Sequence, residues 1–131
     1  MRRGWRVKSP QMQRRILIIE DDADIREALA DAMRDAGAEV VVAADGVDGL
    51  ARLRDGARPV VILLDLRMPR LGGEEFLREM RADPRFEHIP VITMTAGSSV
   101  AEGTDIVARL HKPFDVDDLR QIVESLFDVA A

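Results

Sequence analysis

Two short apolar runs of this sequence end on carboxylates, which are side chains that bind cations or do chemistry. The run RILII is followed by Glu20, Asp21 and Asp22, and the run VVILL is followed by Asp65. If both runs are parallel strands, their carboxyl ends meet at one edge of a sheet, where ligands bind in folds of this kind. Carboxylates crowded there repel one another unless a cation neutralises them. Oxygen ligands favour magnesium or manganese, so the sequence predicts a divalent-cation site.

A hydroxyl and an ammonium stand at the ends of two further apolar runs. IPVITMT ends in Thr95, and VARLH is followed by Lys112. At the same sheet edge these groups would flank Asp65 and form a cradle for an anion with several equatorial oxygens, for which a phosphoryl group is the best candidate. A single acid after a strand usually caps the next helix, and Asp22 or Asp24 is expected to do so. Capping does not account for the whole set.

The composition excludes several classes of protein. With 131 residues, 47% of them hydrophobic and 33% charged, the chain is that of one globular domain. It has no cysteine and two histidines, which excludes disulfides, thiol catalysis and a zinc cage. No apolar run approaches the roughly 20 residues of a membrane span, and the N-terminus lacks the apolar middle of a signal peptide. A cytoplasmic location is therefore expected.

Charge divides the chain into a tail and a body. Residues 1–15 contain six of the 19 basic residues and no acid, so the rest of the chain sets 13 basic residues against all 24 acidic ones. The segment RRGWRVKSPQMQ has neither helical nor strand periodicity. We expect residues 1–13 to be a basic, flexible tail and residues 14–131 to form the domain. Contact of the tail with nucleic acid or an anionic membrane is the weaker alternative.

Strands and helices alternate along the body. Helical spacing of apolar residues, with stops at Gly37 and Gly56, a start at Asp45 and an end before Pro84, predicts the helices between the strands. This alternation indicates an α/β fold with a five-stranded, doubly wound parallel sheet. A fourth helix is due within residues 96–106, but their glycines predict that it is short, irregular or missing. The predicted strands are 15–19, 39–43, 60–64, 89–95 and 107–111.

Four segments together resemble the receiver domain of bacterial two-component response regulators. They are ILIIEDDADIR, VILLDLRMPRLGG, VITMTA and HKPF, and the resemblance extends over residues 15–128. It implies a flavodoxin-like receiver fold with strand order 2-1-3-4-5. Since no second domain is evident, the stand-alone, single-domain type is expected.

The resemblance also implies the metal site. By similarity Glu20 and Asp21 occupy the positions of the family's acidic pair, and Asp65 is the aspartate that is phosphorylated. These three carboxylates, with the main-chain carbonyl of Arg67, would hold Mg²⁺ or Mn²⁺.

Thr95 and Lys112 would hold the phosphoryl oxygens by the same similarity, and the Lys112-Pro113 bond is expected to be cis. One departure from the family concerns switching. Arg109 stands where the family usually has an aromatic residue that moves with the switch threonine. The usual coupling between threonine and aromatic residue is therefore not expected here.

The implied function is that of a phosphoacceptor signalling protein, not an enzyme. A sensor histidine kinase or a histidine phosphotransfer protein would phosphorylate Asp65, and the output would be a contact with a further protein or an onward phosphorelay. Direct DNA binding and membrane binding are not expected. One alternative is a Mg²⁺-dependent phosphohydrolase with an aspartyl nucleophile, although that class places an acid where Arg67 stands. The other is a pseudo-receiver that works as a scaffold without phosphorylation.

Overall fold

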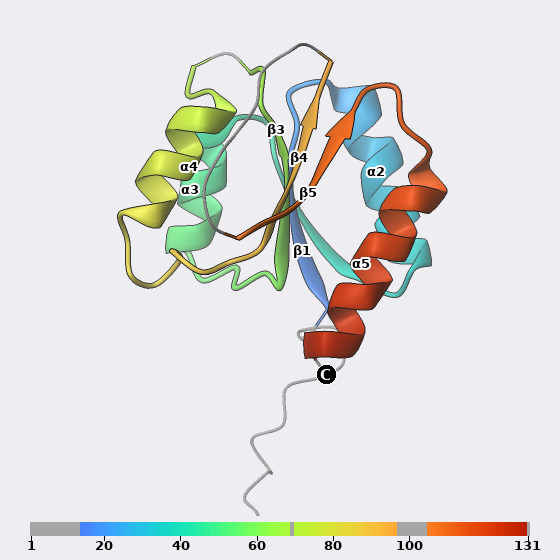
Figure 1. Cartoon of the computed structure of the whole chain (residues 1–131). Coiled ribbons are helices and arrows are strands. Elements are labelled where there is room, and N and C mark those ends of the chain that lie inside the picture. Colours follow the sequence, from blue (N-terminus) through green and yellow to red (C-terminus); the bar gives the residue numbers. More distant parts are fainter. Residues whose placement is uncertain (1–13, 69, 97–104, 131) are drawn as a thin grey trace, which may run out of the picture.

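A computed structural model describes residues 14–68, 70–96 and 105–130, with side chains as far as residue 127. Its centre is a five-stranded parallel sheet of order β2-β1-β3-β4-β5, which confirms the predicted topology (Figure 1). Each strand lies within two residues of its predicted position. The strands are β1 Arg15–Ile19, β2 Glu39–Ala43, β3 Val61–Asp65, β4 Val91–Thr95 and β5 Ile106–His111.

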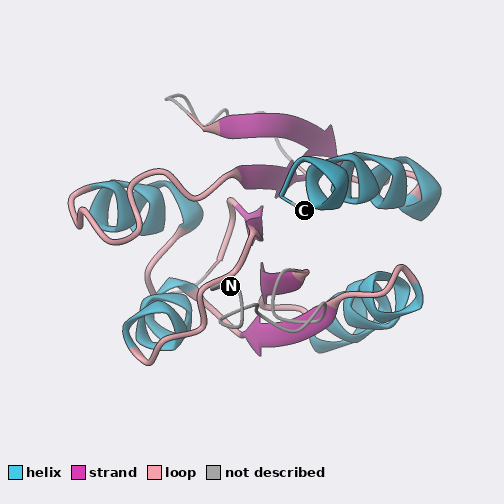
Figure 2. Ribbon diagram, turned by 90° about the horizontal axis from the view of Figure 1, so that it is seen from below, coloured by secondary structure: helices cyan, strands magenta, loops and turns pink. Residues whose placement is uncertain are grey.

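Helices cover both faces of the sheet. The helices α2 and α5 pack on one face, and α3 and α4 pack on the other (Figure 2). This layering confirms the doubly wound fold and leaves the carboxyl ends of the strands open to the loops. The described helices are α2 Ala23–Asp35, α3 Gly46–Arg54, α4 Gly73–Arg81 and α5 Val116–Ala130.

The central strands are buried on both faces, which is why their sequences are continuously apolar. In β1, Ile16 and Ile18 face α2 and α5, whereas Leu17 and Ile19 face α3 and α4. All four side chains are fully buried. A strand held from both sides in this way is a rigid base for the residue that follows it.

The helix boundaries follow the predicted signals. Asp22, rather than Asp24, caps α2 by accepting hydrogen bonds from the N–H groups of Asp24 and Ile25. Asp45 caps α3, as expected. Ile25 and Val47 are apolar residues in the first turns of α2 and α3, and they are 37% and 46% exposed.

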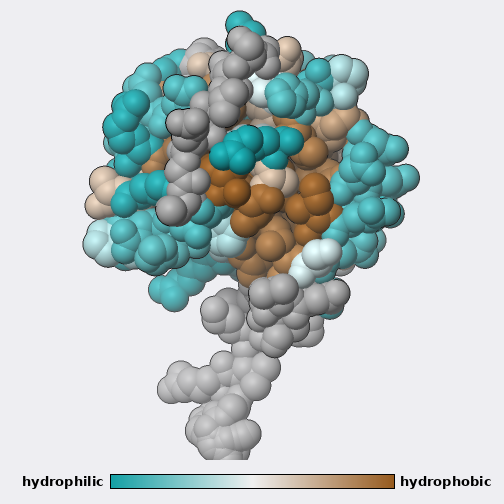
Figure 3. Space-filling model, in the orientation of Figure 1, coloured by the Kyte–Doolittle hydropathy of each residue, from teal (hydrophilic) through white to brown (hydrophobic). Residues whose placement is uncertain are grey.

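The β4–β5 edge contains an irregularity that the sequence did not predict. Ile106 pairs with Val91 and Ala108 pairs with Ile92, so Val107 is an extra residue in the ladder and is 45% exposed. Figure 3 shows an apolar area along β5 and beside α5 on this face. The short or irregular helix is predicted within residues 96–106, of which residues 97–104 lie outside the described residues. The predicted tail, residues 1–13, lies outside them as well. Of the described helices, none is long and apolar enough to cross a membrane.

Candidate functional site

Three predicted metal ligands come together at the carboxyl edge of the sheet. Glu20 and Asp21 follow β1, and Asp65 ends the adjacent strand β3. One carboxylate oxygen from each lies within 4.8 Å of the others. Glu20 is fully buried and Asp65 is 4% exposed, whereas Asp21 is exposed to solvent. The cluster is therefore open on one side and rigidly supported on the other.

Lys112 lies beside this cluster, after the end of β5. Its Nζ donates to Glu20 Oε1 at 2.7 Å and lies 3.6 Å from Asp65 Oδ2. The sequence predicts this ammonium near Asp65, and in the structure its shorter contact is to Glu20. The Lys112-Pro113 bond is cis, as expected. Lys112 thus links the acidic pair to the predicted phosphoacceptor.

Burial and neighbouring charges shift the pKa values of this pair. Burial is the main cause that raises the pKa of Glu20 to about 7; the hydrogen bond from Lys112 lowers it in part, and Asp65 raises it. For Lys112, burial by itself would lower the pKa, but the hydrogen bond and charge of Glu20, with the charge of Asp65, outweigh burial and raise it. Lys112 therefore stays charged at neutral pH, while Glu20 titrates near neutrality.

The loop between β3 and α4 is folded against Asp65. The N–H of Arg67 donates to Asp65 Oδ1 at 3.1 Å, and the N–H of Gly73 donates to the carbonyl of Leu66 at 3.2 Å. A Cβ on Gly73 would lie 2.7 Å from the Asp65 carbonyl oxygen, so only glycine lets α4 begin this close to β3. The main chain of Arg67 is thereby held next to the carboxylate, while its side chain is exposed.

Thr95 ends β4 on the other side of Asp65. It is 4% exposed, and its main-chain carbonyl accepts the N–H of Lys112 at 2.7 Å. The β3–β4 ladder brings Met94 opposite Asp65, so Thr95 is the next residue along that edge. The structure therefore brings all the predicted site residues to one end of the sheet.

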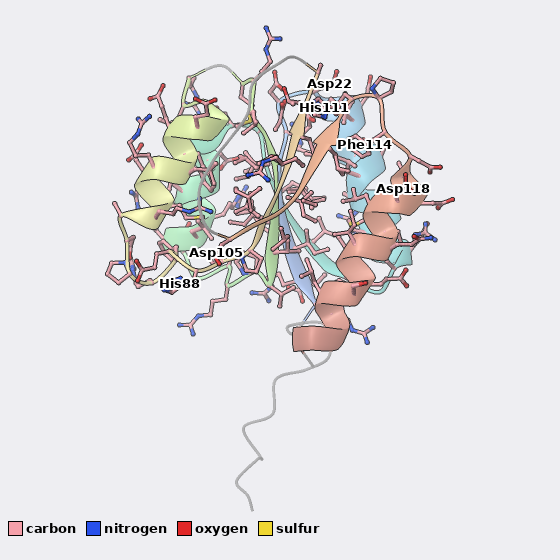
Figure 4. All side chains as sticks on the ribbon, in the orientation of Figure 1. Asp22, His88, Asp105, His111, Phe114 and Asp118 are labelled. Atoms are coloured by element: carbon pink, nitrogen blue, oxygen red, sulfur yellow. The ribbon has the colours of Figure 1, made fainter. Side chains whose placement is uncertain are left out.

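The histidines do not belong to this cluster. Figure 4 shows His88 and Asp105 at the end of the sheet opposite to His111 and Asp22, and His88 Nδ1 lies 3.4 Å from Asp105 Oδ2. His111 precedes Lys112 and is exposed. Within the described residues, the group that could hold a metal contains carboxylates without histidine. Carboxylate oxygens and an adjacent main-chain carbonyl are donors that suit Mg²⁺.

Two contacts around the site were not anticipated. Arg26 Nη1 donates to the main-chain carbonyl of Glu20 at 2.9 Å, and Arg70 forms an ion pair with Asp45. Asp45 was identified as a helix cap, but no local pattern identifies the arginine 25 residues away as its partner. In the sequence, such a contact is indicated only by the presence of an arginine in a loop near the end of a strand.

The family comparison agrees with this geometry. Residues 16–124 match the family model described as the response regulator receiver domain. The chain belongs to that family. Receiver domains are signalling modules of two-component systems that work with histidine kinases or phosphotransfer proteins, and they are not classical enzymes.

Curated relatives of this receiver domain are themselves response regulators. Response regulator Rre1 of Synechocystis sp. is 32% identical over 117 residues, which are 85% of this chain and 50% of the relative. Response regulator MprA of Mycobacterium sp. strain KMS is 37% identical over 110 residues, or 80% of this chain and 46% of the relative. The chain thus spans about half the length of the curated relatives it matches.

Solved receiver structures share the fold over nearly their whole length. Chemotaxis protein CheY4 of Vibrio cholerae has a TM-score of 0.74 and 28% identity, covering 86% of this chain and 97% of that one. The receiver domain of the sensor histidine kinase PA1611 from Pseudomonas aeruginosa PAO1 has a TM-score of 0.75 and 28% identity, covering 88% and 98%. That structure is described with a magnesium ion coordinated in its active-site cleft.

Proposed function

We propose that this receiver domain accepts a phosphoryl group on Asp65, in a Mg²⁺-dependent reaction, from a histidine kinase or a histidine phosphotransfer protein. The observation that carries the proposal is the cluster of Glu20, Asp21 and Asp65 oxygens within 4.8 Å of one another, with the Lys112 ammonium beside it. Such a cluster needs a cation, and together with Lys112 it offers positive charge to the oxygens of a phosphoryl group.

Asp65 is positioned to act as the nucleophile. It ends a fully buried strand, so its carboxylate has little freedom to leave the reactive geometry. In the transfer, a carboxylate oxygen of Asp65 forms a bond to phosphorus while the bond from phosphorus to the donor's histidine nitrogen breaks. The electron pair of the broken bond returns to the imidazole. The product is an acyl phosphate on Asp65.

Glu20, Asp21, Asp65 and the main-chain carbonyl of Arg67 would hold the magnesium ion. When bound, the ion supplies positive charge that offsets the charge on the transferring phosphoryl group. Asp21 is the exposed member of the cluster, and Glu20 and Asp65 form its buried part. The hydrogen bond from the Arg67 N–H to Asp65 Oδ1 supports the assignment, because it holds this stretch of main chain beside the site.

Thr95 and Lys112 would hold the remaining phosphoryl oxygens. Lys112 Nζ is already 3.6 Å from Asp65 Oδ2, so a phosphoryl group on Asp65 would come within reach of the ammonium. The main-chain hydrogen bond between Lys112 and Thr95 keeps the two residues at a fixed separation. Their roles rest on this placement and on the family resemblance.

The output of the domain would be a contact with another protein or an onward phosphorelay. Because the chain spans about half of its curated relatives, the downstream partner is proposed only as a class. Absence of direct DNA binding and a cytoplasmic location stay predictions from the sequence.

Two alternatives make different predictions. A phosphohydrolase of the aspartyl-nucleophile class would need an acid at position 67, where the structure has an exposed arginine. A pseudo-receiver scaffold would keep the fold without accepting phosphate. The presence of the complete acidic cluster with Lys112 favours the phosphoacceptor.

The direct test is phosphorylation by a small donor. The protein is incubated with acetyl phosphate and Mg²⁺, and intact mass is expected to rise by roughly 80 Da, the mass of one phosphoryl group, as an acid-stable and base-labile adduct. Asp65→Asn should lose this adduct, because an amide is a poor nucleophile. Asp83→Asn, a change in the turn after α4, should retain it. Full labelling of Asp65→Asn would move the site elsewhere, and an unlabelled wild-type protein would favour the scaffold.

A further inference from the structure

The loop between β3 and α4 joins the site to the first turn of α3. At its far end, Arg70 Nε donates to Asp45 Oδ2 at 2.5 Å. The Asp45 side chain is 9% exposed, whereas that of Arg70 is 62% exposed. The acidic partner is therefore buried, and the arginine reaches down to it from the surface.

Asp45 is itself fixed by the helix that it caps. Its Oδ1 accepts the N–H of Asp48 at 2.9 Å, so one oxygen caps α3 while the other accepts from Arg70. Arg70 lowers the pKa of Asp45, which keeps this carboxylate ionised over the working range of pH. The arginine thus has a charged partner that cannot easily move.

The main chain of the loop also packs directly on α3. The N–H of Gly46 donates to the carbonyl of Leu71 at 3.1 Å, and a Cβ on Gly46 would lie 2.5 Å from that oxygen. Arg70 has a φ of 60°, a left-handed conformation that a non-glycine residue adopts at a cost. The contacts of Arg70 and Leu71 with α3 offset that cost and hold the loop in this form.

We propose that Arg70 is a positioning residue for the metal site: its ion pair with Asp45 anchors the far end of the loop that carries the Arg67 carbonyl. This inference rests on the proposed function, which makes that carbonyl a metal ligand. The loop is tied at one end by the Arg67 N–H on Asp65 and at the other by Arg70 on Asp45. Releasing the second tie allows the main chain at Arg67 to leave the position beside the carboxylates.

The test compares Mg²⁺ affinity, measured by calorimetric titration, in wild type and Arg70→Ala. If Arg70 anchors the loop, the variant should bind Mg²⁺ about three- to tenfold more weakly. This loss is smaller than the loss expected on removing a residue that hydrogen-bonds directly to a metal ligand. The direction of the change in Mg²⁺ affinity is decisive. Removing a positive charge would by itself strengthen cation binding, so weaker binding indicates positioning rather than a long-range charge effect. Equal or tighter binding by Arg70→Ala would overturn the inference.

A matched control is available at Arg85. Its side chain is 63% exposed and lies 2.7 Å from Asp83, so it has nearly the same exposure and the same kind of partner as Arg70. Arg85→Ala should leave Mg²⁺ affinity unchanged. Asp45→Asn, which keeps an oxygen to cap α3, should weaken binding as Arg70→Ala does. The double variant should be no weaker than either single one, and additive losses would contradict a shared anchor.

Phosphorylation separates failure of this inference from failure of the proposed function. Initial labelling by acetyl phosphate should be slower in Arg70→Ala at low Mg²⁺ and should recover at saturating Mg²⁺, which a general loss of structure would not produce. If wild type and Arg70→Ala are labelled alike at every Mg²⁺ concentration, Arg70 has no positioning role although the proposed function stands. If wild type neither binds Mg²⁺ nor is labelled, both fail.

Discussion

Asp65→Asn should make the protein more stable in the absence of Mg²⁺. The amide keeps the shape of the carboxylate and can still accept the N–H of Arg67 through Oδ1. It removes one negative charge from a site where the oxygens of Glu20, Asp21 and Asp65 lie within 4.8 Å of one another. The negative charge of Asp65, which would serve phosphorylation, therefore lowers the free energy of unfolding when no Mg²⁺ is bound.

The size of the effect follows from the distances. If each like-charge pair is placed at the 4.8 Å limit of the cluster and the effective dielectric constant is about 20, each pair costs about 3.5 kcal/mol. The Lys112 ammonium at 3.6 Å returns about 4.6 kcal/mol. Removing the Asp65 charge therefore raises the free energy of unfolding by about 2 kcal/mol when Glu20 is ionised. Because the pKa of Glu20 is raised to about 7, half of its charge is absent at neutral pH. This removes about 1.7 kcal/mol of repulsion, so the gain from losing the Asp65 charge falls to about 0.6 kcal/mol. In a domain of this size that gain raises Tm by about 2 °C.

Thermal unfolding of the two proteins, with and without Mg²⁺, tests this reasoning. For a Kd on the order of 1 mM, about 10 mM Mg²⁺ should stabilise the wild type by about 1.4 kcal/mol and the variant by much less. The wild type should then be the more stable of the two proteins in Mg²⁺. Asp83→Asn removes a carboxylate paired with Arg85 and should gain no stability. An Asp65→Asn variant that melts below wild type without Mg²⁺, or that responds equally to Mg²⁺, would refute the charge argument.

Three further outcomes are expected. Lys112→Ala should still be labelled by acetyl phosphate. In denaturant titrations it should lose about 3 kcal/mol of unfolding free energy, because Glu20 is left buried without its partner. Unchanged stability would contradict this. The apparent Mg²⁺ affinity, measured by calorimetry, should fall by up to about tenfold per pH unit below pH 7, because the cation must displace a proton from Glu20. Glu20→Gln should make the affinity nearly independent of pH in this range. Beryllofluoride should change hydrogen exchange mainly in residues 66–73 and 95–106, where glycines make reordering easy, and strong new protection over residues 107–128 would indicate the family's usual switching instead.

Much of the fold could be predicted because its signals are local. Continuous apolar runs indicate strands that are covered on both faces. Apart from Arg15, β1 and β3 are buried along their whole length. Asp45 and Gly37 mark helix ends through hydrogen bonds and backbone angles that involve residues only a few positions away. Once parallel strands are inferred, the meeting of Glu20, Asp21 and Asp65 follows from topology, since parallel strands end at the same edge.

Tertiary structure decided the contacts that depend on side-chain reach across the fold. The sequence places Lys112 at the site, but only packing determines that its ammonium lies 2.7 Å from Glu20 and 3.6 Å from Asp65. Likewise Arg70 meets Asp45 because the β3–α4 loop folds onto α3, a contact between residues 25 apart with no periodicity to reveal it. Strand and helix patterns repeat every two or 3.6 residues and so can be found in the sequence, whereas a pairing of charges across a loop is set by where the whole chain has placed both ends.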